Sequence, residues 1–311
     1  MDLTRSDLSI VERLCLEECL LRHDPQNRQW MIWGTHGHPL NSSKYLSLPE
    51  EKKPSYLENN EKDSKDSTSH NNKCMVVMGI GGKPPLLLDI PRVKDHQVWV
   101  IKRFSGGGTV VVDDNCLYTT IIGRNDQLTH VPQYPREIMA WTATDVFGPT
   151  FQRLKQTAQK KANNDTLQFP DFELRENDYV LGGTQKVAGN AQAIVKTGFL
   201  HHTTFLWTYE SENMKYLTLP DKRPEYRKDR SHSSFLIKLQ DAYHNQLDRQ
   251  DFFTSLETVC HENFETEQVS LEDALEVMSS AVAGNDGGSS RPNGMQAFFD
   301  TKCRTRLIDL P

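Results

Sequence analysis

The chain has 311 residues with a formal net charge of −6; 25% of the residues are charged and 36% belong to the hydrophobic set. This length allows one large domain or two small ones with a substantial core. The negative charge argues against a nucleic-acid coat or a membrane-surface binder, both of which need clustered basic residues, and no apolar run is long enough to cross a bilayer. We therefore predict neither a nucleic-acid partner nor a membrane partner.

The six cysteines are scattered, without a CxxC pair or a regular spacing. In a chain of this size they favour a reducing compartment over a disulfide framework, and they form no zinc-binding pattern. The first residues, MDLTRSDLSIVERLCLEECL, are rich in acids and lack an apolar central stretch. They predict neither a transit peptide nor a secretory signal.

The first predicted element is an amphipathic helix that follows Ser9 and stops before Pro25, because apolar residues recur at helical spacing. QWMIWG at 29–34 predicts a buried strand, which CMVVMGI at 74–80 could pair with. Residues 37–73 are nearly all polar and cannot bury enough surface to offset the ordering of their backbone. We predict a disordered insertion or a long hairpin loop there.

Four strand-like runs follow between residues 76 and 123, namely VVMGI, VWVIKRF, TVVV and LYTTIIG, and they predict a mixed sheet. Residues 135–161 have a helical pattern that Gly148-Pro149 could interrupt. Two further strands are predicted near 178–182 and 198–207.

The last part of the chain has two more helical patterns, at 234–260 and 269–284. The glycine-rich and serine-rich stretch 284–294 predicts a flexible link before a C-terminal segment.

A glycine-rich turn lies between two predicted strands in IKRFSGGGTVVV, residues 101–112. Gly106, Gly107 and Gly108 would let backbone N–H groups approach an anion, because no Cβ blocks the approach and φ > 0 is accessible. Arg103 could add bidentate charge toward a phosphate or carboxylate. The triplet does not match the P-loop or dinucleotide-binding spacing, and a merely tight loop is the alternative.

A second motif is GGTQKVAGNAQAI at 182–194, in which Lys186 precedes Gly189-Asn190-Ala191 by three residues. A long flexible cation beside small residues suits an acyl phosphate, whose phosphate and carbonyl oxygens both carry negative charge. An exposed turn lysine is the alternative interpretation.

A third motif, FLHHTTFLW, contains His201 and His202 in an apolar strand. Successive side chains in a strand face opposite sides of the sheet, so the two rings cannot both point at one ligand. No third metal ligand lies at a useful spacing, and packed, hydrogen-bonded core histidines are the alternative.

In their order and separation, the motifs R-x-SGGG-T-V…D, K-x-x-GNAQ and HH-x-x-FL resemble the lipoate–protein ligase family, with its biotin/lipoate A/B protein ligase catalytic domain. The resemblance extends over most of the chain through the flanking segments LCLEECLLR, RENDYV, YLTLP and PEYRKDRSH. The pattern looks like the eukaryotic, plant-type branch without the bacterial accessory domain. The resemblance implies an α+β fold with mixed or antiparallel sheets flanked by helices, as a single domain over 1–311.

The resemblance also implies roles for individual residues. Lys186 should be catalytic and bind both the lipoate carboxyl and the α-phosphate of ATP, while His201 and His202 support the site. Asp113 stands where the family has an acidic residue and could help to place Mg²⁺, although no metal ligands are assigned. The residues that should contact the acyl-adenylate are Arg103, Ser105, Gly106, Gly107, Gly108, Thr109, Val110, Val111, Gly189, Asn190 and Ala191.

Two departures from the pattern stand in the same region. Val112 replaces a histidine of the bacterial members, so no role is carried over to it. Cys116 could be the thioester-forming nucleophile of an acyltransferase, or a small buried hydrophobe.

The implied activity is ATP-dependent conversion of lipoate to lipoyl-AMP, followed by transfer of the lipoyl group to a lysine. ATP, Mg²⁺ and lipoate would be required, and the acceptors would be lipoyl domains of 2-oxoacid dehydrogenase complexes and the glycine cleavage H protein. The alternatives are an ATP-independent octanoyl or lipoyl transferase and a non-catalytic lipoyl-binding adaptor. These acceptors imply a mitochondrial protein, with a cytoplasmic one as the alternative.

Overall fold

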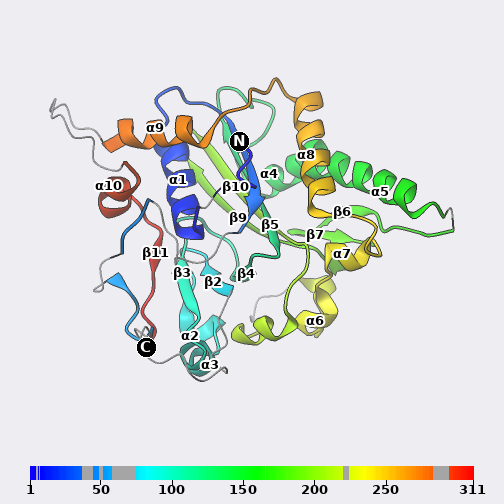
Figure 1. The fold of residues 1–311 in the computed structure, drawn as a ribbon, viewed down its shortest axis with the longest axis horizontal. Coiled ribbons are helices and arrows are strands. Elements are labelled where there is room, and N and C mark those ends of the chain that lie inside the picture. Colours follow the sequence, from blue (N-terminus) through cyan, green and yellow to red (C-terminus); the bar gives the residue numbers. More distant parts are fainter. Residues whose placement is uncertain are drawn as a thin grey trace.

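The structure is a computed structural model, and its centre is a four-stranded antiparallel sheet with the order β1-β5-β10-β9 (Figure 1). Its strands are β1 (Trp30–Thr35), β5 (Cys116–Arg124), β10 (Gly198–Leu206) and β9 (Ala188–Val195). The structure describes residues 1–4, 6, 8–36, 45–48, 52–57, 74–164, 166–219, 224–282 and 294–311.

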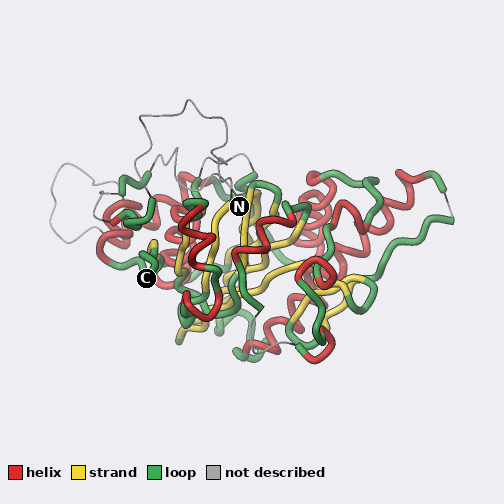
Figure 2. The backbone as a smooth tube through the Cα atoms, turned by 90° about the horizontal axis from the view of Figure 1, so that it is seen from below, coloured by secondary structure: helices red, strands yellow, loops and turns green. Residues whose placement is uncertain are grey.

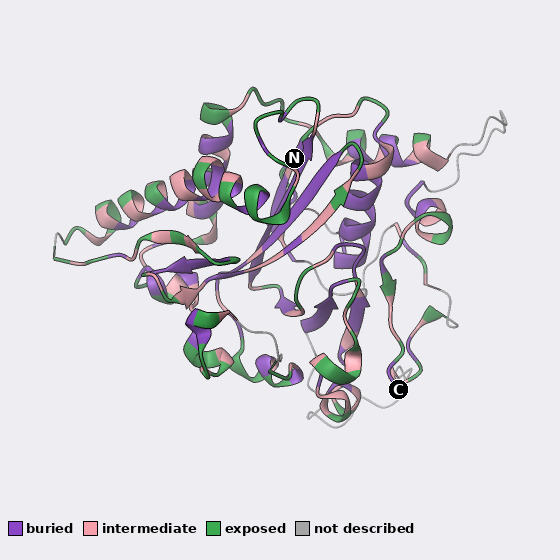
Figure 3. Ribbon diagram, turned by 180° about the vertical axis from the view of Figure 1, so that it is seen from behind, coloured by how far each residue is buried: buried purple, intermediate pink, exposed green. Residues whose placement is uncertain are grey.

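Helices cover both faces of this central sheet, as Figure 2 shows from below. On one face lies α1 (Ile10–His23), with α9 (Leu271–Val282) and α10 (Gly294–Thr301) packed against it. On the other lie α4 (Pro135–Trp141), a π-helical segment η2 (Thr142–Phe147), α5 (Gly148–Ala162) and α8 (Arg249–Asn263). Each face has its own apolar core, and the two middle strands, β5 and β10, are almost wholly buried between them (Figure 3). The predicted α+β fold with sheets flanked by helices is confirmed.

Helix α1 begins where the sequence predicts, because Ser9 caps it. The Ser9 hydroxyl accepts from the backbone N–H of Glu12, and the Glu12 carboxylate accepts from the backbone N–H of Ser9. This reciprocal pair satisfies two backbone donors that a helix N-terminus leaves unpaired.

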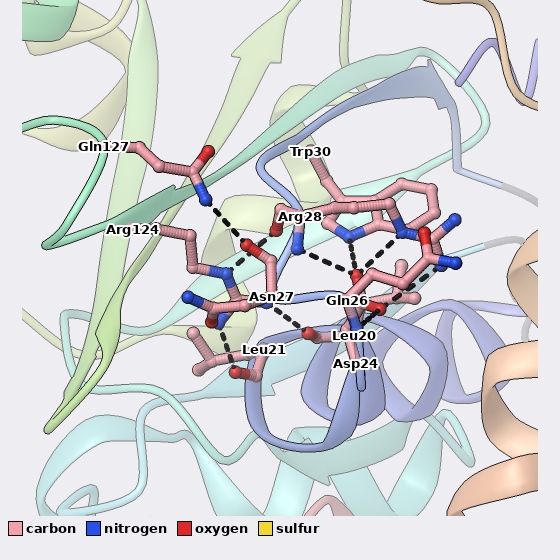
Figure 4. A network of polar contacts seen from close by, with 9 residues as sticks. All are labelled: Leu20, Leu21, Asp24, Gln26, Asn27, Arg28, Trp30, Arg124 and Gln127. Carbon is pink, nitrogen blue, oxygen red and sulfur yellow. Dashed lines mark hydrogen bonds and ion pairs between the residues drawn. The ribbon is translucent and has the colours of Figure 1, made fainter.

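The other end of α1 is held by Arg124 at the end of β5. The guanidinium donates to the carbonyls of Leu20, Leu21 and Arg28, each at 2.8 Å (Figure 4). Arg124 is only 1% exposed. Because these carbonyls lie at or just beyond the helix C-terminus, the bonds fix the helix relative to the sheet.

A second sheet has the order β11-β3-β2-β4 and is mixed, since β2 and β3 run parallel. Its strands are β11 (Arg306–Leu307), β3 (Trp99–Lys102), β2 (Cys74–Met78) and β4 (Val110–Asp113). The predicted pairing of 29–34 with 74–80 is wrong. Both edges of β2 are taken by β3 and β4, while β1 pairs along its whole length with β5.

The third sheet contains β6 (Phe172–Arg175), β7 (Asp178–Leu181) and β8 (Gln185–Lys186). Gly182 and Gly183 have φ of +56° and +72°, a conformation that glycine adopts without strain. This turn brings β8 back along β7, so that Lys186 pairs with Val180.

The helical pattern at 135–161 is confirmed, with a change of register close to the predicted interruption. Segment η2 ends just before Gly148, whose backbone N–H donates to the carbonyl of Ala143. Pro149 has no N–H and is the second residue of α5, in the first turn, where a missing donor is tolerated.

The single helix predicted at 234–260 is wrong, because the chain turns between three separate helices there. His244 and Asn245 have φ of 52° and 58°, which ends the helical path, and Asp248 caps the next helix. The helices are α6 (His232–Phe235), α7 (Leu239–Ala242) and α8.

Short elements complete the described part of the chain, and two predicted segments lie mostly outside it. The polar insertion predicted at 37–73 lies outside the described residues except for 45–48 and 52–57, where Leu46 is buried in the core beside α1. The predicted link at 284–294 also lies outside them, except Gly294, which begins the unpredicted helix α10. None of the helices in the described part of the chain has the length and apolar character needed to cross a membrane. The remaining short elements are α2 (Pro84–Leu87), α3 (Ile90–Asp95), η3 (Ser211–Tyr216) and η4 (Glu225–Arg227).

Candidate functional site

The glycine loop between β3 and β4 is packed directly on β9. Gly106 N–H donates to the carbonyl of Gln192 at 2.8 Å. Gly107 has φ of +104°, and a Cβ at that position would lie 2.7 Å from the carbonyl oxygen of Asn190. Only glycine allows this approach. The SGGG and GNA motifs, which are far apart in the sequence, therefore form one surface.

The side chain of Arg103 stabilises the conformation of this loop. Its side chain is buried and donates to the hydroxyl of Ser105 and to the carbonyls of Val77, Gly106 and Gly108, at 2.7 to 3.1 Å. Burial lowers the pKa of Arg103 to about 10, so it stays charged at neutral pH. The guanidinium is thus largely engaged with the protein, and its predicted contact with a ligand stays a prediction.

A small cavity of about 30 Å³, room for roughly one water molecule, lies beside this surface. Helix α1 and strand β5 supply its other wall with Arg13, Leu14 and Tyr118, and His36 follows β1. The sequence-predicted residues that line the cavity are Arg103, Val110, Gly189, Asn190, Ala191 and His202.

A larger hollow of about 450 Å³ lies at the β1 edge of the central sheet. Met31, Trp33, Trp141 and Phe264 contribute to its lining, and none of the residues from the three motifs does. The motifs therefore converge on the smaller cavity.

Strand β4 divides its residues between two environments, as the two-residue period of a strand requires. Val110 and Val112 line the cavity. Val111 packs into a separate core on the other side of the sheet, and Asp113 accepts from the backbone N–H of Asn115. Burial raises the pKa of Asp113. Asp113 and Val111 thus lie apart from the cavity lining.

Lys186 also stands apart from the cavity lining. Its Nζ lies 2.6 Å from Oδ1 of Asp178, and the other carboxylate oxygen of Asp178 accepts from the hydroxyl of Tyr226 at 2.8 Å. Asp178 is 5% exposed, whereas a quarter of the Lys186 side chain is exposed. The lysine is held at a partly open position, two residues before β9 begins.

His202 connects the glycine loop to α1. Its Nε2 lies 2.6 Å from Oε2 of Glu17, and its Nδ1 lies 3.4 Å from Oγ of Ser105. Burial would raise the pKa of Glu17, but Arg13 and His202 outweigh it and hold the pKa at about 2. Burial lowers the pKa of His202 despite Glu17, so the neutral ring donates to the carboxylate.

His201 lies on the opposite side of the central sheet. Its ring is within 3.1 Å of the Tyr179 hydroxyl, the Gln192 side-chain amide and the Thr203 hydroxyl. Burial lowers its pKa to about 3. It is therefore a neutral, hydrogen-bonded core residue, and the two histidines diverge as their spacing predicts.

Cys116 has the surroundings of a structural cysteine. It is 1% exposed, packs against Leu206, Tyr209 and Met214, and burial raises the pKa of its thiol. A nucleophile must reach the substrate as a thiolate, so this cysteine does not fit that role.

Among the described residues, no three His, Cys, Asp or Glu side chains gather in a way that could hold a metal ion. The protein groups near Asp113 therefore do not form a Mg²⁺ site by themselves.

Sequence reasoning missed the residues that α1, β5 and His36 bring to the cavity. Arg13 pairs with Glu17 at 2.7 Å, and the guanidinium stacks 3.9 Å above the ring of Tyr118. The available signal was the spacing of four residues between Arg13 and Glu17, which places opposite charges on one side of a helix. An ion pair of this kind is ordinarily solvent-exposed, and only the fold shows that this one is buried.

The sequence pattern of the lipoyl protein ligase A/B catalytic domain matches residues 57–261. This is more than half of the chain, which therefore belongs to that family. A curated protein of Plasmodium falciparum (isolate 3D7), named inactive lipoate–protein ligase 2, is 29% identical over 212 residues, 63% of this chain and 55% of that protein. The chain thus spans about half the length of this relative.

Two solved structures share the fold. One is a bipartite lipoate protein ligase of Thermoplasma acidophilum, studied with its E2 lipoyl domain, with a TM-score of 0.53 and 14% identity over 95% of this chain and 94% of that chain. The other is LipL1 of P. falciparum in complex with lipoate, with a TM-score of 0.54 and 16% identity over 94% of this chain and 68% of that chain.

Proposed function

We propose that this protein is a lipoate–protein ligase that activates lipoate with ATP and transfers the lipoyl group to a lysine of a lipoyl domain. The observation that carries the proposal is the packing of Gly107 against Asn190, which joins two motifs of the family into one surface. The lipoate and the lipoyl domain described with the two related folds support the choice of acyl group and acceptor.

In the first step of the proposed reaction, a lipoate oxygen bonds to the α-phosphorus of ATP and pyrophosphate leaves. In the second, the neutral amine of the acceptor lysine attacks the carbonyl carbon, AMP leaves with the bonding electrons, and the amine loses a proton. The proposed reaction assigns the role of general base to none of the described side chains. Their contribution is binding and charge stabilisation, which can account for much of a rate enhancement.

The roles of individual residues follow from their positions. Backbone N–H groups of the glycine loop would face the phosphate, and Asn190 adds a buried Nδ2 that has no hydrogen-bond partner in the described structure. Lys186 would neutralise charge on the mixed anhydride, held extended by Asp178 until the ligand arrives. Mg²⁺ would accompany the ATP phosphates, since the described residues form no metal site for it.

A second candidate function is a non-catalytic adaptor that binds lipoyl-AMP or a lipoyl domain. It is favoured by the relative whose name calls it inactive and by Val112, an apolar residue in the cavity wall. A thiol-dependent transferase has less support, because Cys116 is buried.

The test separates the two half-reactions. The protein is incubated with lipoate, ATP, Mg²⁺ and a purified lipoyl domain, and pyrophosphate and the acceptor mass are measured independently. A complete ligase yields both products. Modification only from supplied lipoyl-AMP would assign transfer alone, and no modification from either donor would reject the proposal. A Cys116→Ser variant that lost transfer would revive the thiol route.

The acceptors we propose are lipoyl domains of 2-oxoacid dehydrogenase complexes and the glycine cleavage H protein, and this choice implies work in mitochondria. The measurement is the same mass assay on each purified acceptor, with localisation of the tagged protein in cells. Discrimination among acceptors would narrow the proposal, and a cytoplasmic location would contradict its last part.

A further inference from the structure

We propose that Arg13 is a specificity-determining residue that limits the length of the acyl chain the site accepts. This inference rests on the proposed function, because it assumes that the cavity between the glycine loop and α1 receives the acyl group of an acyl-adenylate. No sequence motif pointed to Arg13, and its position in the structure is what assigns the role.

The cavity lining contains both polar and apolar groups. Strand β9 contributes Gly189, Asn190 and Ala191, whose backbone groups could meet a phosphate or carbonyl. Helix α1 and strand β2 contribute the apolar side chains of Leu14 and Val77. An acyl-adenylate bound with its anhydride at β9 would direct its hydrocarbon chain toward these apolar side chains.

Arg13, next to Leu14 on α1, brings a cation to this part of the lining. Its side chain is 7% exposed and lines the cavity. The volume left open is only about 30 Å³, well below the 300 Å³ or more that is usual for ligand pockets. The side chain of Arg13 therefore occupies space that a chain would otherwise enter.

Three contacts hold Arg13 in this position. Nη1 pairs with Glu17 at 2.7 Å, the guanidinium stacks on Tyr118, and Nη2 lies 3.5 Å from Nδ1 of His36. A buried ion pair is costly to break, because each separated charge would lack a partner. These contacts therefore hold the Arg13 side chain in one position in the cavity lining.

The Nε donor of Arg13 also bears on the length of acyl chain that the cavity accepts. Its Nε is buried and has no hydrogen-bond partner among the described residues. A saturated chain that reached this atom would offer it no acceptor, so the N–H would stay unpaired. Extension of the chain past Arg13 therefore meets a steric penalty and gains no hydrogen bond.

The test measures binding of non-hydrolysable hexanoyl, octanoyl, decanoyl and lipoyl sulfamoyl-adenosine analogues by titration calorimetry. We expect the affinity of the wild-type protein to decrease as the acyl chain of the analogue lengthens from hexanoyl to decanoyl. Arg13→Ala should bind the decanoyl analogue about tenfold more tightly than wild type does, as expected when two methylenes gain an apolar site. Arg13→Lys, which keeps the charge beside Glu17, should show a smaller gain.

Arg22→Ala is the matched control, because Arg22 forms the same type of pair with Glu18 on the same helix at 3.1 Å and does not line the cavity. Its chain-length profile should equal that of wild type. An equal shift in Arg22→Ala, or an unchanged profile in Arg13→Ala, would overturn the inference. Should Arg13→Ala fail to fold, the double variant Arg13→Ala/Glu17→Gln, which removes both charges of the buried pair, tests the same prediction.

Transfer is assayed in parallel, from lipoyl-AMP to a lipoyl domain. If wild type binds the analogues but transfers nothing, the proposed function fails and the chain-length inference stands on binding alone. If wild type transfers and Arg13→Ala keeps the wild-type chain-length limit, the inference fails and the proposed function stands. Absence of binding by every variant overturns the inference.

Discussion

The imidazole Nε2 of His202 lies 2.6 Å from Oε2 of Glu17, so strand β10 and helix α1 are joined at the wall of the candidate site. The other oxygen of Glu17 is within 2.7 Å of Arg13 and of the Thr120 hydroxyl. A fully buried carboxylate is thereby kept charged and paired. The relative position of the two cavity walls therefore depends in part on this side chain.

Replacement of Glu17 should test that dependence. Glu17→Gln leaves the buried Arg13 without its counter-charge, so the free energy of unfolding should fall by about 3 to 5 kcal/mol in urea titrations. The double variant Arg13→Met/Glu17→Gln removes both charges and should be less destabilised than Glu17→Gln. A single variant as stable as wild type would show that the pair is not needed.

The glycine loop offers a comparison between adjacent glycines. Gly107→Ala places a methyl group 2.7 Å from the carbonyl oxygen of Asn190 at a φ of +104°, so we expect about 1 to 3 kcal/mol of destabilisation. Lipoyl transfer should fall about tenfold or more, because the loop must shift. At Gly108 a Cβ would meet no described atom within 4 Å, and Gly108→Ala should change stability far less. Similar losses in both variants would contradict this account.

Lys186 carries the sharpest prediction for the reaction. Lys186→Ala should reduce lipoyl-lysine formation at least about a hundredfold in the mass assay, because charge on the anhydride would go unneutralised. The fold should persist, since Asp178 keeps the Tyr226 hydroxyl as a partner. Lys215→Ala is the control, as Lys215 forms an exposed pair with Glu212. Wild-type lipoylation by Lys186→Ala would refute the catalytic role.

The free energy of unfolding should fall at acidic pH, because the buried ring of His201 is neutral in the folded protein. Burial lowers its pKa from 6.5 to about 3, so the unfolded chain binds a proton as the pH falls through 6.5 while the folded protein does not. Its contribution is complete above that pH and is lost progressively toward pH 3. Between pH 7 and pH 5 we expect a loss of about 2 kcal/mol.

The measurement for His201 is urea unfolding at both pH values. His201→Gln should reduce the pH dependence without removing it, because burial also lowers the pKa values of His36 and His202. Equal or greater stability at pH 5 would contradict the prediction.

The local elements near the site could be read from the sequence. Apolar residues at helical spacing after Ser9 predict α1, apolar runs predict most strands, and the glycine triplet predicts a turn that other groups can approach closely. These features depend on neighbours along the chain. The order of the SGGG, GNA and histidine motifs was enough to indicate the family, which the match over 57–261 shows.

Contacts between residues that are far apart in the sequence could not be predicted from such local features. The choice of β5 over β2 as the partner of β1 depends on which strand edges remain free. The placement of Lys186 beside Asp178, away from the cavity lining, depends on a turn and on a second carboxylate contact from Tyr226.

The sequence by itself determined where the helices and strands near the site form and where a glycine-rich turn joins two of the strands, because periodicity and φ act over a few residues. Only the tertiary structure decided that Arg13 and Glu17 are buried at the cavity. Charges at this helical spacing are equally suited to a solvated face. Burial of α1 on all sides, by sheets from distant parts of the chain and by α9 and α10, makes them part of the site.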